Sequence, residues 1–294
     1  MKSEARNPHL DELDIDFLYH LGLNTGMDLK NMFSGVKYVC MGGSADRAEA
    51  LAQKAAEELG VAVPEGGVQT IGKTERFSLY RVGPVISCSH GMGMPSMSIL
   101  LHEMAKLMDY AGCQDVQFIR VGTSGGVGVE PGTVIVAEEG LNGKLQLAFE
   151  QVELGETYSY QTRLDRQLAQ DILAARGDIR AQLGKTMGTD DFYEGQGRLD
   201  GALKPRYTEA QRMAFLRRAN EAGVRNIEME APAFAAFCLR AGIPAAIVCT
   251  TLLNRLEGDQ VRSTPEQLAQ FSDNAQRVVL RYIRGQLGKA VAGA

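Results

Sequence analysis

The chain has 294 residues, 45% of them hydrophobic, and its 31 basic and 36 acidic residues leave a formal charge of −5. This length can bury a full core, and without a linker or charge block residues 1–294 are expected to form a single domain, with flexible tails over 1–10 and 288–294. The acidic balance argues against a nucleic-acid-binding protein, and no apolar run reaches the ~18 residues of a membrane span.

The cysteines indicate a reducing compartment. They form an odd set without C-x-x-C spacing, and several lie in apolar, strand-like runs, so reduced core thiols are expected rather than disulfides or metal ligands. The first residues lack the apolar segment of a secretory signal. A cytoplasmic protein is therefore predicted. The residues are Cys40, Cys88, Cys113, Cys238 and Cys249.

Strand-like and helix-like segments alternate along the chain. The predicted strands are 36–41, 77–82, 85–89, 116–121, 133–138, 224–227 and 245–252. The predicted helices are 45–59, 95–110, 164–175, 209–222, 231–241 and 265–287. This alternation predicts an α/β fold with a largely parallel, helix-covered sheet, in which ligands bind where strands end and glycine-rich loops begin.

The segment 116–126 is the most informative of these junctions. An apolar run ends at Arg120 and is followed by Gly122, Thr123, Ser124 and Gly125. An arginine beside free backbone N–H groups and hydroxyls is typical of an oxyanion or phosphate site. The stretch contains no lysine, so it is not a nucleotide P-loop.

The same segment satisfies Gly-x-Ser-x-Gly, the nucleophile elbow of α/β-hydrolases. That fold places its catalytic histidine after the serine. The chain's histidines, however, are His9, His20, His90 and His102, all upstream of it. The order excludes the elbow and leaves the anion site.

Two earlier junctions lead from a strand into a helix. In residues 41–47, Gly43 allows close backbone approach, Ser44 can cap the helix, and Arg47 falls in its first turn. This is an anion site or an ordinary link with a surface arginine. In residues 89–96, Pro95 opens a helix after two glycines, and His90 is a candidate base, although the pattern favours a packed structural histidine.

Residues 191–198 combine Phe192, Gln196 and Arg198 in a glycine-punctuated loop. An amide offers a donor and an acceptor, a guanidinium offers a planar donor fork, and an aromatic ring offers a stacking face. The set suits a planar heterocycle bearing an imide. The alternative is a polar surface loop.

Two further strand ends carry charge. Glu228 and Glu230 flank Met229 and, in an extended chain, point to one side. They could form an acid/base pair, a clamp on vicinal hydroxyls, a metal site or a solvated surface, and metal is disfavoured because no His or Cys lies nearby in sequence. The last strand ends near Arg255, and a lid is predicted to follow around Gly258.

Together these segments resemble the nucleoside phosphorylase superfamily, and within it the animal-type uridine phosphorylases. The resemblance runs from about Asn7 to Gln286 and rests on 192–201 (Phe-Tyr-Glu-Gly-Gln-Gly-Arg-Leu-Asp-Gly), 225–230 and 252–260 (Leu-Leu-Asn-Arg-Leu-Glu-Gly-Asp-Gln). It implies a single domain with a central mixed, twisted β-sheet flanked by helices. It also implies reversible phosphorolysis of uridine to uracil and ribose 1-phosphate. The absence of a carboxylate from Thr251-Leu252-Leu253-Asn254 fits a pyrimidine rather than a purine substrate.

The resemblance further implies roles for individual positions. Phosphate would be bound by Gly43, Arg47, Arg120 and Thr123, with Arg76 from a neighbouring subunit. The base would be bound by Phe192, Gln196, Arg198, Leu252, Leu253 and Arg255. The ribose would be bound by Glu228, Met229 and Glu230, with His20 from the partner. Of these, Arg120, Arg198, Gln196 and Glu230 would be catalytic.

The same resemblance implies a homo-oligomer, a dimer with shared active sites, that uses phosphate as co-substrate and needs no metal or cofactor. Three alternatives remain at this stage. They are a phosphorylase with broader pyrimidine specificity (deoxyuridine, thymidine), a nucleosidase that uses water, and a nucleoside sensor without catalysis.

Overall fold

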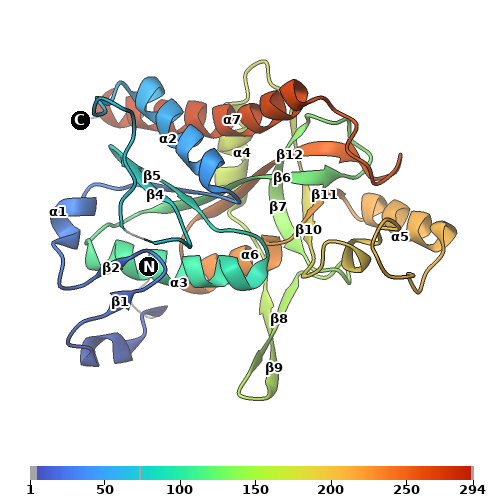
Figure 1. The fold of residues 1–294 in the computed structure, drawn as a ribbon, viewed down its shortest axis with the longest axis horizontal. Helices are drawn as coiled ribbons and strands as arrows, with labels where there is room; N and C mark the ends of the chain where they lie inside the picture. Colours follow the sequence, from blue (N-terminus) through green and yellow to red (C-terminus); the bar gives the residue numbers. More distant parts are fainter. Residues whose placement is uncertain (1–4, 73, 293–294) are drawn as a thin grey trace.

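The computed structural model describes residues 5–72 and 74–292 and confirms the predicted α/β fold (Figure 1). Its α-helices are α1 (Leu29–Phe33), α2 (Ala45–Leu59), α3 (Met94–Tyr110), α4 (Arg166–Ala174), α5 (Glu209–Glu221), α6 (Ala231–Ala241) and α7 (Pro265–Ala292). Short 3-10 helices cover Pro8–Glu12 and Glu194–Gln196. The strands are β1 (Phe17–Leu18), β2 (Leu23–Asn24), β3 (Tyr38–Gly42), β4 (Leu79–Val82), β5 (Val85–Ser89), β6 (Gln117–Gly126), β7 (Val134–Leu141), β8 (Ala148–Glu153), β9 (Glu156–Gln161), β10 (Ala181–Gly188), β11 (Val224–Glu228) and β12 (Ala245–Asn254).

The central sheet is mixed, with the order β11-β10-β7-β12-β6-β3-β5-β4. Most neighbours are parallel, but β4 and β5 are antiparallel, and so are β7 and β12. The two ends of part of the sheet also meet, because β11 pairs with β6 through Asn226↔Gly126 and Ile227↔Gly125. Strands β6, β12, β7, β10 and β11 therefore form a closed ring.

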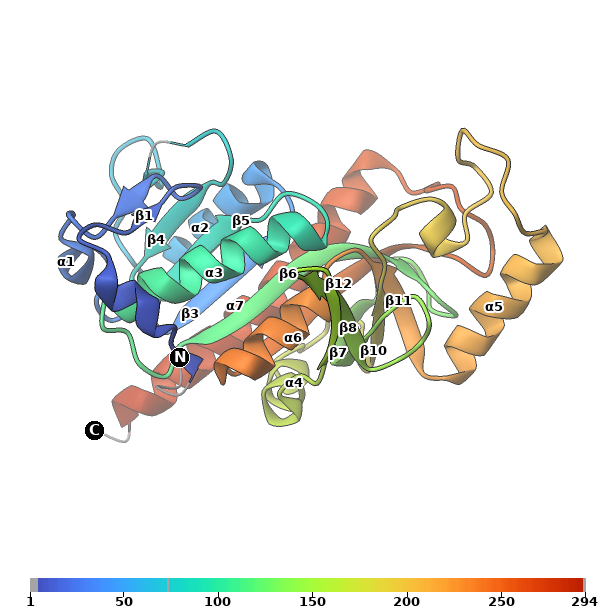
Figure 2. The ribbon, with the colours of Figure 1, turned by 90° about the horizontal axis from the view of Figure 1, so that it is seen from below.

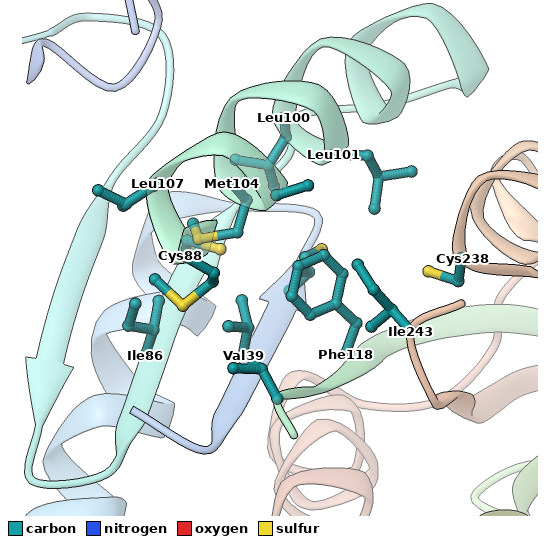
Figure 3. Packing of buried hydrophobic residues seen from close by; sticks show 14 of the residues in the cluster. Val39, Ile86, Cys88, Leu100, Leu101, Met104, Leu107, Phe118, Cys238 and Ile243 are labelled. Atoms are coloured by element: carbon teal, nitrogen blue, oxygen red, sulfur yellow. The ribbon is translucent and has the colours of Figure 1, made fainter. Parts of the chain in front are cut away.

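Helices cover the sheet in two groups. In Figure 2, α3 and α6 lie side by side on one face, while α7 crosses the other. Helix α7 also contacts α2 and α4. Figure 3 shows side chains of α3, among them Leu101 and Met104, pointing toward Val39 and Phe118 of the strands. The sheet is thus buried on both faces, which explains why its strands read as continuous apolar runs.

Helix α2 shows how directly the sequence determines some elements. Its buried residues Ala48, Leu51, Ala52, Ala55 and Ala56 recur at helical spacing on one face. Gly60 ends the helix in the left-handed conformation, with φ of 63°. The predicted bounds 45–59 are confirmed.

Strand β6 differs from its prediction. The expected glycine loop after Val121 is instead strand as far as Gly126, because Thr123 and Ser124 pair with Thr250 and Thr251 of β12. Part of the backbone assigned to an anion cradle is thus used for sheet pairing. Thr123 and Arg120 nevertheless line the cavity described below.

Strand β10, the β8–β9 hairpin and the β1–β2 pair were not predicted from the sequence. Strand β10 (Ala-Gln-Leu-Gly-Lys-Thr-Met-Gly) lacks an apolar run and is held by its neighbours on both sides. The β8–β9 hairpin is mostly exposed and extends away from the body in Figure 1, so no burial pattern marks it. The two-residue strands β1 and β2 are too short for a periodic signal.

The tails contain more structure than their composition indicates. Arg6 donates to Asp109 of α3, and Pro8–Glu12 forms a 3-10 helix. Residues 288–292 continue α7. Residues 1–4 and 293–294 lie outside the described part, so the predicted flexibility stays a prediction. No helix within the described residues is long and apolar enough to cross a membrane.

Candidate functional site

A cavity of about 190 Å³ lies where β3, β6, β11 and β12 end and the loop after β10 folds over them. It brings together the predicted site residues from every part of the chain. Those that line it are Gly43, Arg47, Arg120, Thr123, Phe192, Gln196, Arg198, Glu228, Met229, Glu230, Leu252, Leu253 and Arg255. His90, Gly91, Met92, Gly122, Ser124, Gly125, Ile227 and Val261 complete the lining.

One end of the cavity is cationic. Arg47, in the first turn of α2, donates from Nη1 to the Thr123 hydroxyl at 3.2 Å. A Cβ atom on Gly43 would lie 2.9 Å from the Arg47 guanidinium, so only glycine leaves this room. Ser44 occupies the N-cap position, but its side chain makes no capping bond, contrary to prediction. Burial and the nearby Arg120 lower the pKa of Arg47 from its ordinary value, as expected of a cation that lacks an anionic partner.

The centre of the site is a buried ion cluster. Arg120 donates from Nη2 to Glu230, approaches Glu228 Oε2 at 3.0 Å, and donates from Nη1 to Cys249 Sγ at 2.8 Å. Glu230 also accepts from the Gly93 N–H at 2.6 Å. The two carboxylates converge because Glu228 ends β11 and Glu230 occupies the N-cap position of α6, not because the chain is extended as predicted.

The two carboxylates of this cluster titrate differently. Burial, reinforced by Glu230, raises the pKa of Glu228 to about 8, although Arg120 counteracts it. Burial also opposes ionisation of Glu230, but Arg120 and the Gly93 N–H outweigh it and hold the pKa of Glu230 at about 2. Glu230 is therefore the ionised member of the pair, and Glu228 is the one that can hold a proton.

The opposite end of the cavity is built from the loop after β10. Gln196 is buried, and its backbone and side-chain oxygens accept from Arg255 at 2.9 and 3.4 Å. Arg198 donates from Nε and Nη2 to the carboxylate of Asp200 at 2.8 and 2.7 Å. Its guanidinium lies 4.5 Å from the Phe192 ring centre. An amide, a guanidinium and an aromatic face are thus fixed side by side.

Asp259 joins this loop to the segment after β12, where a lid was predicted. Its Oδ1 accepts from Arg212 at 2.6 Å and from Arg255 at 2.9 Å. The backbone carbonyl of Asp259 accepts from Arg198 at 3.0 Å. The sequence pattern gave no reason to single out Asp259 among the acidic residues there, because its guanidinium partners come from α5, from the position directly after β12 and from the loop after β10.

Two predicted residues do not line the cavity. Arg76 is exposed, and His20 lies with Nδ1 2.6 Å from Glu103 Oε1. The His20 ring is 6.0 Å from the ring of Phe77, the neighbour of Arg76. The two residues therefore share one region of the surface, outside the cavity.

Sequence reasoning also undervalued two residues. Cys249 was assigned to the core without reference to a site, yet its sulfur contacts Arg120. His90 was favoured as a packed histidine, yet it lines the cavity. His90 carries the local signal of a strand end before two glycines, whereas Cys249 carries none, since its contact with Arg120 comes from the pairing of β12 with β6.

No group of three or more His, Cys, Asp or Glu within residues 5–72 and 74–292 could hold a metal ion. The carboxylates of Glu228 and Glu230 are engaged by Arg120 and by backbone N–H groups. The cavity therefore combines a cationic end, a pair of buried carboxyl groups, and a loop that carries an amide, a guanidinium and an aromatic ring.

Comparison with known proteins finds related sequences and similar folds. The sequence profile of the phosphorylase superfamily matches residues 37–284. The chain is 44% identical over 292 residues to mouse uridine phosphorylase 1, covering 98% of this chain and 94% of that protein. The structure of a uridine phosphorylase from the oomycete Phytophthora capsici matches with a TM-score of 0.93 and 45% identity, covering 97% of this chain and 98% of that one. A Schistosoma mansoni uridine phosphorylase in complex with uracil matches with a TM-score of 0.91 and 39% identity, covering 96% and 99%.

The charge on Asp259 is expected to stabilise the fold. Asp259→Asn keeps the side-chain size but leaves Arg212 and Arg255 without their shared counter-ion in a site where their side chains are 5% and 1% exposed. Removing one partner from buried ion pairs of this kind lowers the free energy of unfolding by about 3–5 kcal/mol. Urea unfolding followed by circular dichroism measures this change.

A matched control is Asp178→Asn, because the Asp178 carboxylate meets Arg281 while 87% exposed. We expect no measurable shift in its urea midpoint. Equal midpoints for the two variants would contradict the role given to Asp259.

Proposed function

The chain belongs to the uridine phosphorylases of the phosphorylase superfamily, and from this premise we propose that it catalyses the reversible phosphorolysis of uridine to uracil and ribose 1-phosphate. The observation that carries the proposal is the alignment in one cavity of an arginine-rich end, buried carboxylates and a loop suited to an imide. The protein is thus a pentosyltransferase of pyrimidine salvage and catabolism.

Phosphate binds at the cationic end under this proposal. Arg47, Arg120 and Thr123 hold the dianion, and the absence of a side chain on Gly43 leaves space beside it. Guanidinium groups are donors only and match phosphate oxygens as a planar fork. Holding phosphate against the anomeric carbon makes the attack effectively intramolecular.

The ribose lies at the carboxylate centre. Glu230, the ionised member of its pair, accepts from the 2′-hydroxyl and orients it, with Met229 and Glu228 adjoining. Cleavage of the N-glycosidic bond develops positive charge on the sugar, and a fixed carboxylate nearby opposes the cost of that charge. Because Arg120 contacts both carboxylates and borders the phosphate site, it couples the two substrates.

Uracil is read at the other end. The departing imide anion spreads its charge onto carbonyl oxygens, which Arg198 and the Gln196 amide stabilise as it forms. Phe192, Leu252 and Leu253 supply the apolar walls. Charge on the leaving base is thus handled by fixed donors, without a strong general acid.

The site is completed by a second copy of the chain. Exposed apolar side chains near His20 support a subunit contact there: Phe17 and Tyr19 are 64% and 74% exposed, and the Tyr19 ring lies 5.1 Å from the His20 ring. In a dimer, Arg76 of one subunit reaches the phosphate of the other, and His20 reaches the ribose 5′-hydroxyl.

Phosphate serves as a co-substrate, and the chemistry calls for no cofactor. The five cysteines are free thiols, and four of them are buried in the described structure, which suits a reducing compartment. We assign the protein to the cytoplasm on this ground.

The direct test follows uridine by absorbance with and without phosphate. Uracil should form only with phosphate, together with ribose 1-phosphate. Free ribose as the product would identify a water-using nucleosidase, and binding without turnover would identify a sensor. Faster cleavage of inosine than of uridine would overturn the pyrimidine assignment.

The arginines at the phosphate end are expected to dominate turnover. Arg120→Ala should lower the rate of phosphorolysis by about 10²–10³-fold, the usual effect of losing one preorganised charged donor. It also leaves Glu228 and Glu230 without a counter-ion, so Arg47→Ala, whose guanidinium contacts Thr123 only, separates catalysis from folding. Steady-state kinetics at varied phosphate measure both.

Arg284→Ala is the control, since that arginine pairs with Glu58 on the surface and should leave the rate unchanged. Near-normal turnover of Arg47→Ala and Arg120→Ala at saturating phosphate would defeat the assignment.

Gln196 is expected to affect the nucleoside more than the anion. Gln196→Ala removes the amide that pairs with the imide edge, and the KM for uridine should rise about 10-fold or more while the KM for phosphate stays within about twofold. The surface variant Gln270→Ala, on α7, should change neither constant. A larger effect on phosphate than on uridine would refute the base-reading role.

A further inference from the structure

His90 is a buried polar group that the mechanism above does not use. It directly follows β5, lines the cavity and has no exposed surface. Its backbone is fixed, because its N–H donates to the Gly42 carbonyl at 2.7 Å and its carbonyl accepts from Ser96 Oγ at 2.6 Å. The strand β3 and the first turn of α3 therefore fix the backbone from which the ring enters the cavity lining.

Both ring nitrogens of His90 are buried and have no hydrogen-bond partner among the described residues. A histidine packed for structural reasons normally has such a partner, because an unpaired buried polar atom is destabilising. The Nε atoms of Arg47 and Arg120 share this condition. Three residues that line the cavity thus carry buried polar atoms without a partner among the described residues.

The position of the ring identifies that part. A Cβ atom on Gly43 would lie 3.9 Å from His90 Cε1 and 2.9 Å from Arg47 Nη2, so the imidazole and the guanidinium both border Gly43, and all three residues line the cavity. Burial, Arg120 and Arg47 lower the pKa of His90 to about 3, against the opposing effect of Glu230. The ring is therefore neutral at physiological pH.

We propose that the neutral imidazole of His90 hydrogen-bonds the phosphate co-substrate directly, in the space that it shares with Gly43 and Arg47. This rests on the proposed phosphorolysis and adds a phosphate ligand to it. His90 acts as a binding and orienting group, and no proton is consumed or released.

The chemistry of hydrogenphosphate explains why a neutral ring suits this place. Arginines donate only, whereas hydrogenphosphate carries one P–OH proton that needs an acceptor. The Thr123 oxygen already accepts from Arg47, and Glu230 is engaged by Arg120 and Gly93. The unprotonated nitrogen of a neutral imidazole can accept a hydrogen bond from that P–OH group. In the other tautomer, the ring N–H can donate a hydrogen bond to an unprotonated phosphate oxygen.

The test compares His90→Leu with His90→Gln. Leucine removes the hydrogen bond, and the KM for phosphate should rise about 10- to 100-fold while the KM for uridine changes less than about twofold. Glutamine retains a donor and an acceptor and should recover part of the loss. Calorimetry with inorganic phosphate alone should show a matching loss of affinity in His90→Leu.

His102→Leu is the matched control, because His102 is a histidine of α3 whose ring packs on Phe237 outside this cavity. It should leave both constants unchanged. Unaltered phosphate affinity in His90→Leu, or an increase confined to the KM for uridine, would overturn the inference.

Two further measurements keep the outcomes distinct. If His90→Leu does not fold, imidazole 15N spectra of the unsubstituted protein decide the matter. Phosphate should shift the resonances of His90 and not those of His102, and an unshifted His90 overturns the inference. Failure of the unsubstituted protein to cleave uridine would refute the proposed function, whereas phosphate calorimetry would still test His90.

Discussion

The buried cluster of Arg120 with Glu228 and Glu230 is the interaction on which the rest of the structure depends. Ions removed from water cost several kcal/mol each unless they are paired and fully hydrogen-bonded. The cluster is satisfied only when β6, the end of β11 and the start of α6 occupy fixed positions, with α3 contributing the Gly93 N–H. The pairing of β11 with β6 supplies those positions. The ion cluster and the closed part of the sheet therefore depend on each other, and together they set the geometry of the proposed sugar site.

The other end of the cavity is organised by the same principle on a different scaffold. The Asp259 carboxylate accepts hydrogen bonds from Arg212 and Arg255, and its backbone carbonyl accepts one from Arg198. These bonds join the segment after β12 and the loop after β10 into one unit. That unit is bonded to α5 through Arg212, and α5 lies at the edge of the molecule in Figures 1 and 2. The phosphate end, by contrast, is built on strands in the middle of the sheet.

The sequence predicted those parts of the molecule whose signals are local. The apolar face and terminal glycine of α2 gave its bounds, and arginines and glycines at strand ends marked the cavity. It failed where partners distant in sequence decide the structure. Strand β6 continues through Gly126 because β12 pairs with it. Strand β10 is extended because it pairs with β7 on one side and with β11 on the other. Arg76 and His20 came only from resemblance, since no local pattern distinguishes a residue that serves another subunit.

The charge along the cavity matches the charge that the proposed reaction develops. Cations face the phosphate, carboxylates face a sugar that becomes positive, and donors face a base that becomes negative. An additional cation in place of His90, at the phosphate end of the cavity, would strengthen phosphate binding in the ground state as much as in the transition state. Binding that is equally strong in both states does not raise turnover. A neutral imidazole adds direction without adding net charge. His90, whose pKa is lowered first by burial and then by Arg120 and Arg47, is the kind of residue that such a site can use to orient its nucleophile.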